Sequence, residues 1–452
     1  MLNRSDNELL CRVGANTPMG KVLREYWHPM LLESELPEKD GAPLRVRLLG
    51  EDLVAFRDTN GEVGLVAENC PHRGASLFFG RNEEEGLRCV YHGWKFNTSG
   101  ACVDMPNEPP ESNFKGKVKV TAYRTRARGG VIWAYMGTRE TPPELPSLEW
   151  NMVPSEQVYV SKRYSECNWV QGVEGGVDSS HSGFLHSPLS SHRAKDENDH
   201  ESNEELRTEG GSRGMIYKAK DKHPHFEVVD TEYGVLVGAR RKAEEDSWYW
   251  RITQFLMPYF SMIPSYGESP KISGHAWVPI DDYTTMAWTA TWHPTRALTE
   301  KEVERMHYGW GLHLGVDTLD TPVPGKPGSE WRPKANASND YLIDWEAQRT
   351  RVFSGLPGTA MQDQALQETM GAIYARWNEH LGTSDTGIIQ MRRRWLRAAR
   401  ELESDGTVPT GVDAPEAYLV RSAGIVLPRD CQWVEECQEF VRATPGVHHA
   451  SA

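Results

Sequence analysis

Two short loops, each with one cysteine and one histidine, constrain this chain more than any other feature of its sequence. Residues 70–74 read Cys-Pro-His-Arg-Gly, and residues 89–94 read Cys-Val-Tyr-His-Gly-Trp. A glycine in each loop allows a tight turn, and the proline stiffens the first loop. Thiolates and imidazoles are common protein ligands of iron and zinc. The two loops therefore predict a shared metal centre.

Two kinds of centre use two cysteines and two histidines: a structural zinc site and a Rieske [2Fe-2S] cluster. Zinc modules usually pair cysteine with cysteine and histidine with histidine within a loop. Here each loop supplies one of each, Cys70 with His72 and Cys89 with His92. A Rieske cluster needs this mixture, because the cysteines hold one iron and the histidines hold the other. The pattern therefore favours a Rieske cluster and redox chemistry.

With these loops the chain resembles the Rieske non-haem iron oxygenases, the ring-hydroxylating oxygenase family, over nearly its whole length. It is most similar to the large, oxygenase subunits of the phthalate dioxygenase-type branch, from the Thr-Pro-Met-Gly start at residues 17–20 to the Gln-Asp-Gln-Ala segment at residues 362–365. The resemblance implies an α+β fold with a small all-β Rieske domain and a catalytic domain. In the catalytic domain, helices flank a large antiparallel sheet in a helix-grip, or START-like, arrangement. Other members of the branch are O-demethylases, so the resemblance leaves the reaction open.

Length and local patterns agree with two domains. The chain has 452 residues, and short apolar runs joined by hairpin signals predict an all-β Rieske domain over residues 41–140. Residues 1–40 and 141–452 would form the catalytic domain, after a proline-rich stretch at 141–146. Strand-like runs at 233–237, 248–252 and 285–289 predict its sheet, and helices are expected at 300–310, 363–381 and 388–402. Residues 316–339 are rich in Pro, Gly and Asp and predict a long surface loop or a flap.

Charge and cysteine content exclude several classes of protein. A net charge of −14 opposes binding to phosphate backbones, so nucleic acid is not expected as a partner. No stretch approaches eighteen uncharged apolar residues, and the first twenty residues have no apolar core like that of a signal peptide. The five cysteines outside the two loops are scattered and odd in number, as is typical of reduced thiols. A cytoplasmic protein without a membrane partner is expected.

A second metal site is predicted from polar residues that recur at steps of three and four, and so share one face of a helix. These residues are Asn168, Gln171, Glu174, Asp178 and His181. A polar face that points inward is expensive unless it binds something. His186 follows His181 by five positions, and Gly183 between them permits a helix break, so both imidazoles can converge on one ion. Two histidines and a carboxylate form the facial triad of non-haem Fe(II) oxygenases.

The resemblance supplies the remaining roles in this second site. It places the carboxylate ligand at Asp363, for which ordinary capping of a helix start is the alternative. It implies that Asp178 bridges His181 to the Rieske ligand His92 of a neighbouring subunit, so that the active unit is a homotrimer or a pair of stacked trimers. Glu174 and Asn168 are expected to line or brace the site; Glu174 could instead complete a hydrogen-bond network.

The resemblance implies a phthalate-like aromatic carboxylic acid as substrate, and the expected reaction is its cis-dihydroxylation by O2. The glycines near residue 210 do not form a dinucleotide fingerprint, because Glu209 replaces the first glycine. NADH electrons must therefore come through a separate reductase, which in this branch is a flavin and [2Fe-2S] protein. Arg207, Arg240 and Arg241 are the candidates for binding the substrate carboxylate. The alternatives are an O-demethylase that acts on a methoxylated aromatic acid, a Rieske electron-transfer protein without oxygenase activity, and a zinc-stabilised binding module.

Overall fold

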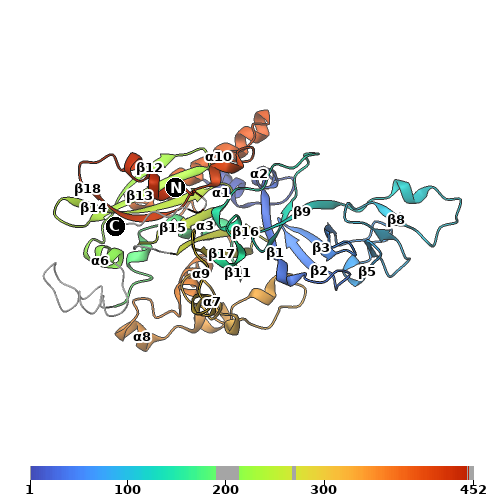
Figure 1. Cartoon of the computed structure of the whole chain (residues 1–452), viewed down its shortest axis with the longest axis horizontal. Coiled ribbons are helices and arrows are strands. Elements are labelled where there is room, and N and C mark those ends of the chain that lie inside the picture. The colour runs from blue at the N-terminus through green and yellow to red at the C-terminus, as the bar shows by residue number, and fades with distance from the viewer. Residues whose placement is uncertain (1, 190–212, 267–270, 445, 447–452) are drawn as a thin grey trace.

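The computed structural model describes residues 2–189, 213–266, 271–444 and 446. Figure 1 shows strands β2 to β8 gathered at one end of the molecule, with the larger part of the chain at the other end. Two sheets form the smaller end and a third sheet forms the centre of the larger part. The mixture of an all-β module with a sheet and helices confirms the expected α+β class.

The first sheet of the smaller module has six strands, and every neighbouring pair in it is antiparallel. Its order is β1 (Trp27–Leu32), β10 (Val131–Tyr135), β9 (Ala122–Arg128), β4 (Val63–Ala67), β3 (Glu51–Arg57) and β2 (Leu44–Leu48). The second sheet has four short strands, β5 (Arg81–Glu83), β6 (Gly86–Arg88), β7 (Lys95–Phe96) and β8 (Cys102–Asp104). The predicted bounds of 41–140 leave out β1, which pairs with β10 in this sheet. The division into domains stays a prediction.

The larger part of the chain is built on an eight-stranded antiparallel sheet. Its order is β11 (Val158–Ser165), β17 (Thr285–Trp292), β16 (Ile272–Pro279), β15 (Phe260–Ile263), β14 (Ser247–Leu256), β13 (Gly234–Lys242) and β12 (His225–Asp230), with β18 (Ala423–Pro428) also paired to β14. The turn after β2 ties the two parts together, because the Leu49 and Gly50 amides donate to the carbonyls of Pro279 and Ile280 at 3.1 and 2.8 Å.

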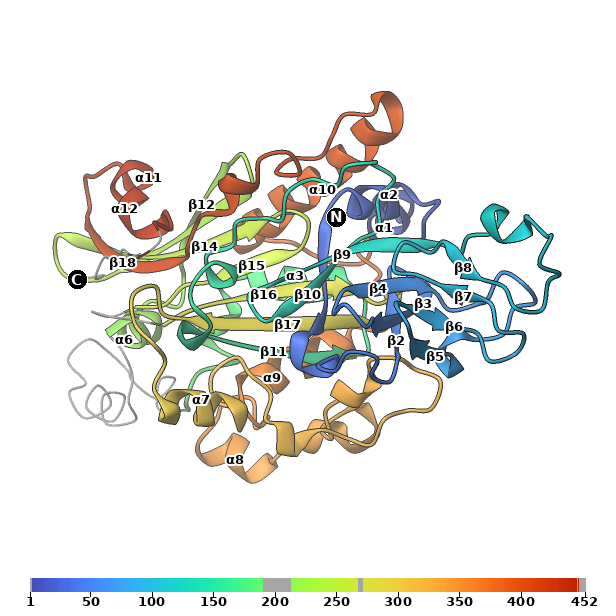
Figure 2. The same ribbon diagram turned by 45° about the vertical axis from the view of Figure 1, so that its right-hand side comes forward.

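Helices surround this sheet. They are α1 (Arg4–Cys11), α2 (Pro18–Arg24), α3 (Trp169–Val177), α6 (Arg213–Lys220), α7 (Glu300–His307), α8 (Trp345–Thr350), α9 (Thr359–Thr369), α10 (Thr386–Asp405), α11 (Trp433–Glu436) and α12 (Gln438–Val441). Figure 2 shows α10 at one side of the catalytic domain and α7, α8 and α9 at the opposite side. Helix α2 begins with Thr17 as N-cap and Pro18 at the first position, both of which are residue types that favour these places.

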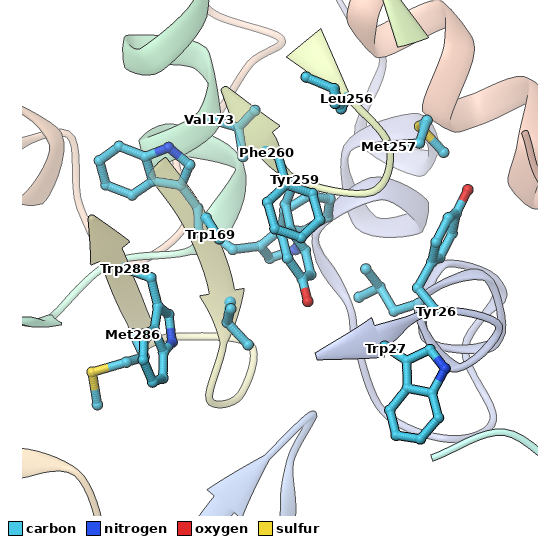
Figure 3. Packing of buried hydrophobic residues seen from close by; sticks show 14 of the residues in the cluster. Tyr26, Trp27, Trp169, Val173, Leu256, Met257, Tyr259, Phe260, Met286 and Trp288 are labelled. Atoms are coloured by element: carbon cyan, nitrogen blue, oxygen red, sulfur yellow. The ribbon is translucent and has the colours of Figure 1, made fainter. Parts of the chain in front are cut away.

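Packing against α10 fixes the position of α3, which precedes the candidate metal site. Trp169 of α3 meets Trp395 of α10 edge-to-face, with the ring centroids 4.8 Å apart. Figure 3 shows Trp169 and Val173 projecting from α3 into the cluster that also contains Tyr259 and Phe260. This apolar contact holds the end of α3 in a defined position.

Of two further predicted segments, the helix at 363–381 differs from the structure, whereas the loop at 316–339 agrees with it. The helix expected at 363–381 is α9, which starts before Asp363 and ends at Thr369, shortly before Gly371 adopts a φ of +96°. Residues 316–339 contain only short 3₁₀ turns, and their side chains bond to the body of the protein. Trp331 Nε1 donates to Glu35 at 3.1 Å, and Arg332 Nε donates to Glu166 at 3.0 Å. Of the two alternatives, the segment therefore has the contacts of a packed surface loop.

Candidate metal centres and active site

The two cysteine loops have the same backbone geometry. The Gly74 amide donates to the carbonyl of Cys70 at 2.9 Å, and the Gly93 amide donates to the carbonyl of Cys89 at the same distance. Both glycines adopt positive φ angles, of +75° and +82°, which side chains disfavour. The first loop joins β4 to β5 and the second joins β6 to β7. The two loops, which have similar sequences, thus also have similar backbone conformations.

The side chains of these loops converge. The rings of His72 and His92 lie with their centroids 4.4 Å apart, and Trp94 stacks on His72 at 4.4 Å. Cys70 and Cys89 are both buried. Burial, together with the adjacent Cys89 thiol, raises the pKa of Cys70 to about 11. Nδ1 of His72 is buried without a hydrogen-bond partner.

These properties fit a bound cluster better than a free pair of thiols. A buried imidazole nitrogen without a partner is unfavourable unless it has a ligand. Burial disfavours thiolates unless a cation compensates their charge, and the irons of a [2Fe-2S] cluster provide that charge. The donor set of two thiols and two imidazoles also matches the ligand requirement of a Rieske cluster.

The predicted second site forms where α3 ends. Asp178 follows the last turn of α3, and a short 3₁₀ turn, His181–Gly183, changes the direction of the chain. Nε2 of His181 lies 3.0 Å from Nε2 of His186. Oδ1 of Asp363, on α9, lies 3.0 Å from Nε2 of His186 and 3.6 Å from Nε2 of His181. Helix α3 ends at Val177, before His181, so the helix break lies earlier in the chain than the break predicted near Gly183. The 3₁₀ turn that follows brings the two histidines and the carboxylate together.

The spacing of these three atoms fits a single metal ion. Ligands at right angles around an ion with bonds of roughly 2.1 Å lie about 3.0 Å apart. His181, His186 and Asp363 offer ligand atoms that all lie within 4.8 Å of one another. Two imidazoles and one carboxylate on one side of an ion form a facial triad, which leaves positions open for other ligands.

Charge and hydrogen bonding favour the ionised form of Asp363 and fix the orientation of His186. Burial opposes ionisation of Asp363, but the hydrogen bond to His186 and the nearby imidazoles hold the pKa of that carboxyl below its usual value. The second nitrogen of His186, Nδ1, lies 2.7 Å from Oε1 of Gln362. Gln362 in turn donates to the carbonyl of Leu356 at 3.2 Å, which fixes the orientation of the imidazole. A role for Gln362 was not predicted from the sequence.

Asp178 lies against the first histidine as predicted from its spacing. Its Oδ2 is 3.3 Å from Nδ1 of His181, and its Oδ1 accepts the Ser180 amide at 2.6 Å. Although burial opposes the charge on His181, the hydrogen bond to Asp178 raises the pKa of the imidazole above its usual value. Asp178 thus has the position of a carboxylate that orients a metal-binding imidazole.

Glu174 and Asn168 do not touch the three ligands. Glu174 accepts two hydrogen bonds from Arg376, at 2.8 and 2.9 Å, and one from Arg392 at 2.6 Å. Asn168 caps α3 and donates to the carbonyls of Cys11 and Asp282 at 3.0 and 2.7 Å. Of the alternatives for Glu174, the structure shows the hydrogen-bond network.

The three candidate arginines differ in their positions. Arg207 lies outside the described residues. Arg240, on β13, lies over the ring of Trp248 with its guanidinium carbon 4.7 Å from the centroid, and its Nη1 is 3.8 Å from Glu227. Arg241 is buried and donates to the carbonyl of Ser179 at 3.2 Å. Neither Arg240 nor Arg241 is among the residues that line the cavity at the triad.

A cavity of about 230 Å³ opens beside the triad, and its wall contains two cations that the sequence analysis missed. They are Arg251, on β14, and Lys218, on α6. Arg251 is 9% exposed, and its Nε donates to Ser179 Oγ at 3.1 Å. Burial and the charges of Arg251 and Arg241 hold the pKa of Lys218 well below its usual value. A charged residue within the apolar run 247–256 is the signal that could have identified Arg251.

Comparison with known proteins decides the family. A family model described as the Rieske [2Fe-2S] domain matches residues 26–123, and one described as LigXa C-terminal domain like matches residues 134–448. The 3-chlorobenzoate-3,4-dioxygenase oxygenase subunit of Comamonas testosteroni is 41% identical over 95% of this chain and 96% of its own length. This chain belongs to the Rieske ring-hydroxylating oxygenases. Rieske oxygenases use a [2Fe-2S] cluster and a mononuclear non-haem iron, so both cofactors belong to this protein.

Other relatives and solved structures agree with this assignment. The phthalate 4,5-dioxygenase oxygenase subunit of Pseudomonas putida is 37% identical over 98% of this Rieske oxygenase and 96% of its own length. Dicamba monooxygenase bound to 3,6-dichlorosalicylic acid has the same fold, with a TM-score of 0.52, 15% identity and coverage of 84% of this chain and 98% of its own. The carbazole 1,9a-dioxygenase terminal oxygenase of Nocardioides aromaticivorans has a TM-score of 0.51, 17% identity and coverage of 85% and 97%. Among the described residues, no helix is long and apolar enough to cross a membrane.

Proposed function

We propose that this Rieske oxygenase cis-dihydroxylates an aromatic carboxylic acid of the phthalate or chlorobenzoate class. The observation that carries the proposal is the pair of cations, Arg251 and Lys218, in the wall of the cavity beside the triad. Two relatives that align over nearly the whole chain are named for 3-chlorobenzoate and phthalate dioxygenation, which supports this substrate class.

The cavity has the properties that such a substrate needs. Buried cations are unfavourable unless an anion compensates them, and a guanidinium binds a carboxylate through two parallel hydrogen bonds. Trp277, Ile263 and Leu312 supply apolar surface for a ring in the same cavity. Arg251 and Lys218 would hold the carboxylate and orient the ring toward His181 and His186.

We assign the two cofactors to the residues described above. Cys70, His72, Cys89 and His92 hold the [2Fe-2S] cluster, and His181, His186 and Asp363 hold the mononuclear iron. When bound, the cluster delivers electrons and the iron activates O2. Asp178 keeps the His181 imidazole oriented, and Gln362 does the same for His186. A separate NADH-dependent flavin and [2Fe-2S] reductase supplies the electrons.

The two centres work between subunits of a homotrimer, as single trimers or stacked pairs. In Figure 1 the strands around the cysteine loops lie at one end of the molecule, away from α3 and α9. A depression of about 550 Å³ beside Asp178 and His181 is lined by exposed apolar side chains. These are Phe184, Phe353, Leu366 and Met370. Val90 and Tyr91, next to His92, are also exposed, so a neighbour's cluster loop would cover this depression and bring its His92 to Asp178.

Two substitutions test this arrangement, together with the mass of the assembly. Asp178→Asn leaves both metals bound but stops reoxidation of the reduced cluster in a single turnover. Tyr91→Glu places a charge at the proposed contact and converts the trimer to monomers in light scattering. An Asp178→Asn protein that reoxidises its cluster at the normal rate would remove the bridge.

O-demethylation is the second candidate reaction. The 5,5'-dehydrodivanillate O-demethylase oxygenase subunit of a Sphingobium strain is 33% identical over 91% of this chain and 84% of its own length. The same triad serves both reactions, and the shape of the cavity decides which bond is attacked. A methoxylated benzoate would place its methyl group, instead of two ring carbons, at the triad.

Oxygen uptake distinguishes the two reactions. The purified protein, NADH and a phthalate-type reductase are combined with benzene dicarboxylates, chlorobenzoates and methoxybenzoates in turn. We expect uptake with a product that is heavier by two oxygens and two hydrogens, or by that amount less HCl where a chlorinated ring carbon is attacked. Loss of a methyl group would establish the demethylase. Absence of substrate-dependent uptake, in protein that holds both metal centres, would contradict the proposed substrate class.

A further inference from the structure

A second cavity lies next to the one at the triad. It has a volume of about 310 Å³, and three segments, at residues 308–318, 333–342 and 357–361, supply its walls. Leu314, Ala335, Pro357 and Met361 make much of its lining apolar, and Leu342, which is 55% exposed, stands at its edge. Its volume and apolar lining suit a single aromatic ring.

Only one layer of residues separates the two cavities. Leu312 lines the cavity at the triad, whereas the next residues, His313 and Leu314, line the second cavity. In the same way Thr359 lines the first cavity and its neighbour Ala360 lines the second. Consecutive residues of two segments thus face opposite sides of a thin partition.

The first partition segment is anchored to the sheet through His313, and a glycine immediately precedes each of the two partition segments. His313 is held by Ser161 Oγ at 2.7 Å and Thr291 Oγ1 at 2.9 Å, so its imidazole is fixed to the sheet. Gly311 and Gly358 adopt φ angles of +70° and +68° immediately before the two partition segments, and neither has a neighbour within 4 Å of where a Cβ would be. Such positions absorb changes in backbone angle without displacing packed atoms.

We propose that the second cavity is the vestibule through which the aromatic acid reaches the triad, with Leu312 and Thr359 as the gate between the two cavities. The proposal rests on the proposed function in one respect: a neighbouring subunit would cover the large depression beside Asp178 and His181. The substrate then needs a different route. The vestibule is lined by Ala360 and Met361 at the start of α9, whereas the depression is lined by residues at the end of that helix, Leu366, Gln367 and Met370.

Cysteine labelling measures passage through the vestibule without any knowledge of the substrate. Thr253, a buried residue that lines the cavity at the triad, is replaced by cysteine, and Cys431, the one cysteine that is not buried, by serine. Benzyl methanethiosulfonate carries a ring of the size of the proposed substrate and labels the new thiol in the assembled protein. Met361→Trp fills the vestibule, and Val408→Trp, at a site 39% exposed and outside both cavities, is the matched control.

We expect Met361→Trp to slow labelling of Cys at position 253 by at least about tenfold, and Val408→Trp to leave its rate unchanged. Labelling at the original rate in the filled protein would overturn the proposal. Circular dichroism and metal content check that the variant folds. If Met361→Trp does not fold, Leu342→Trp narrows the outer edge from an exposed position and is held to the same expectation.

Ligand kinetics supply an independent readout. A gate changes the rates of entry and exit by the same factor, so 3-chlorobenzoate should associate and dissociate more slowly in Met361→Trp with an unchanged Kd. A changed Kd with an unchanged association rate would assign Met361 to the binding site and contradict the vestibule. If the unmodified protein binds no benzoate, the proposed substrate class fails, while the labelling rates still decide whether the vestibule is the route.

Discussion

The buried carboxylate of Glu174 gives the sharpest prediction for a residue that supports the triad without touching it. Its side chain pairs with two guanidinium groups, those of Arg376 and Arg392, and Arg392 also binds Glu379. Arg376 further contacts Asn7 at 3.2 Å, which ties α1 to α3. We predict that Glu174→Gln destabilises the catalytic domain but leaves its chemistry intact.

The magnitude follows from the loss of charge compensation. Gln keeps the size of the side chain, but it leaves two guanidinium groups with the single carboxylate of Glu379. Removing one partner of a buried ion pair costs about 3 to 5 kcal/mol. An unfolding entropy of about 2.1 cal/mol/K per residue, over roughly 350 residues, converts this loss into a Tm lower by about 4 to 7 °C.

Acid should reduce this difference. Burial opposes ionisation of Glu174, but the charges of Arg376 and Arg392 hold its pKa below the usual value. A carboxylate with a lowered folded pKa contributes its stability above the pKa of the unfolded chain, about 4.3, and loses it as the pH falls through the folded pKa. The gap in Tm between the two proteins should therefore narrow below about pH 4.

Thermal unfolding of the metal-loaded proteins, followed by circular dichroism, measures the effect. The matched control is Glu403→Gln, because Glu403 forms an ion pair with Lys21 at 3.3 Å with both side chains about half exposed. Exposed pairs contribute less than about 1 kcal/mol, so this variant should unfold close to the unmodified protein. An unchanged Tm for Glu174→Gln, together with lost turnover, would refute the structural role and assign Glu174 a part in the chemistry.

Four further predictions concern the cavity and its ligands. Arg251→Met should lower kcat/KM for benzoates by about 10- to 100-fold in steady-state assays, and have little effect on analogues without a carboxylate. Lys218→Met should raise Tm by the equivalent of up to about 1 kcal/mol, because it removes a half-buried cation, while it raises KM. In the unmodified protein, KM should rise as the pH rises through the lowered pKa of Lys218, because the ammonium loses its charge. The charge of Arg251 contributes to the lowering of this pKa, so Arg251→Met should move the rise in KM to higher pH. Gln362→Leu should weaken binding of the mononuclear iron by roughly tenfold in metal analysis and leave the cluster spectrum unchanged.

The sequence was most informative where the chemistry is local. Cys70 and His72, and Cys89 and His92, lie within single turns, so their spacing alone predicts that each pair converges. The convergence of His181 and His186 was predicted from a helix break at Gly183, but α3 already ends at Val177, so the position of the break was wrong. Asp363 is different, because its carboxylate comes from a distant helix. Only resemblance to the family identified it.

Charged residues were harder to place, because their partners are distant in sequence. The polar face of α3 predicted that Glu174 binds something, but its partners, Arg376 and Arg392, follow it by 202 and 218 positions. The arginines of β13 show that the register of a strand determines which side chains lie on each face of the sheet. Arg240 lies opposite Trp250, whose ring stacks on Trp433 at 4.6 Å, and Arg241 lies on the other face of the strand. The sequence alone does not give the pairing of β13 with its neighbours, so it does not show which face of this strand lies toward the cavity.

A single turnover with labelled oxygen tests the central claim most directly. The purified protein, with its cluster reduced by dithionite and its iron site filled, is mixed with 3-chlorobenzoate and ¹⁸O₂, and the product is identified by mass. The account predicts a product that contains both labelled oxygen atoms: a chlorinated dihydrodiol, or the dihydroxybenzoate that remains when the chlorinated carbon is attacked and HCl is lost. A His181→Ala protein should keep the cluster spectrum but form no product. A fully loaded protein that leaves the whole panel of benzoates unchanged while its cluster stays reduced would contradict the account.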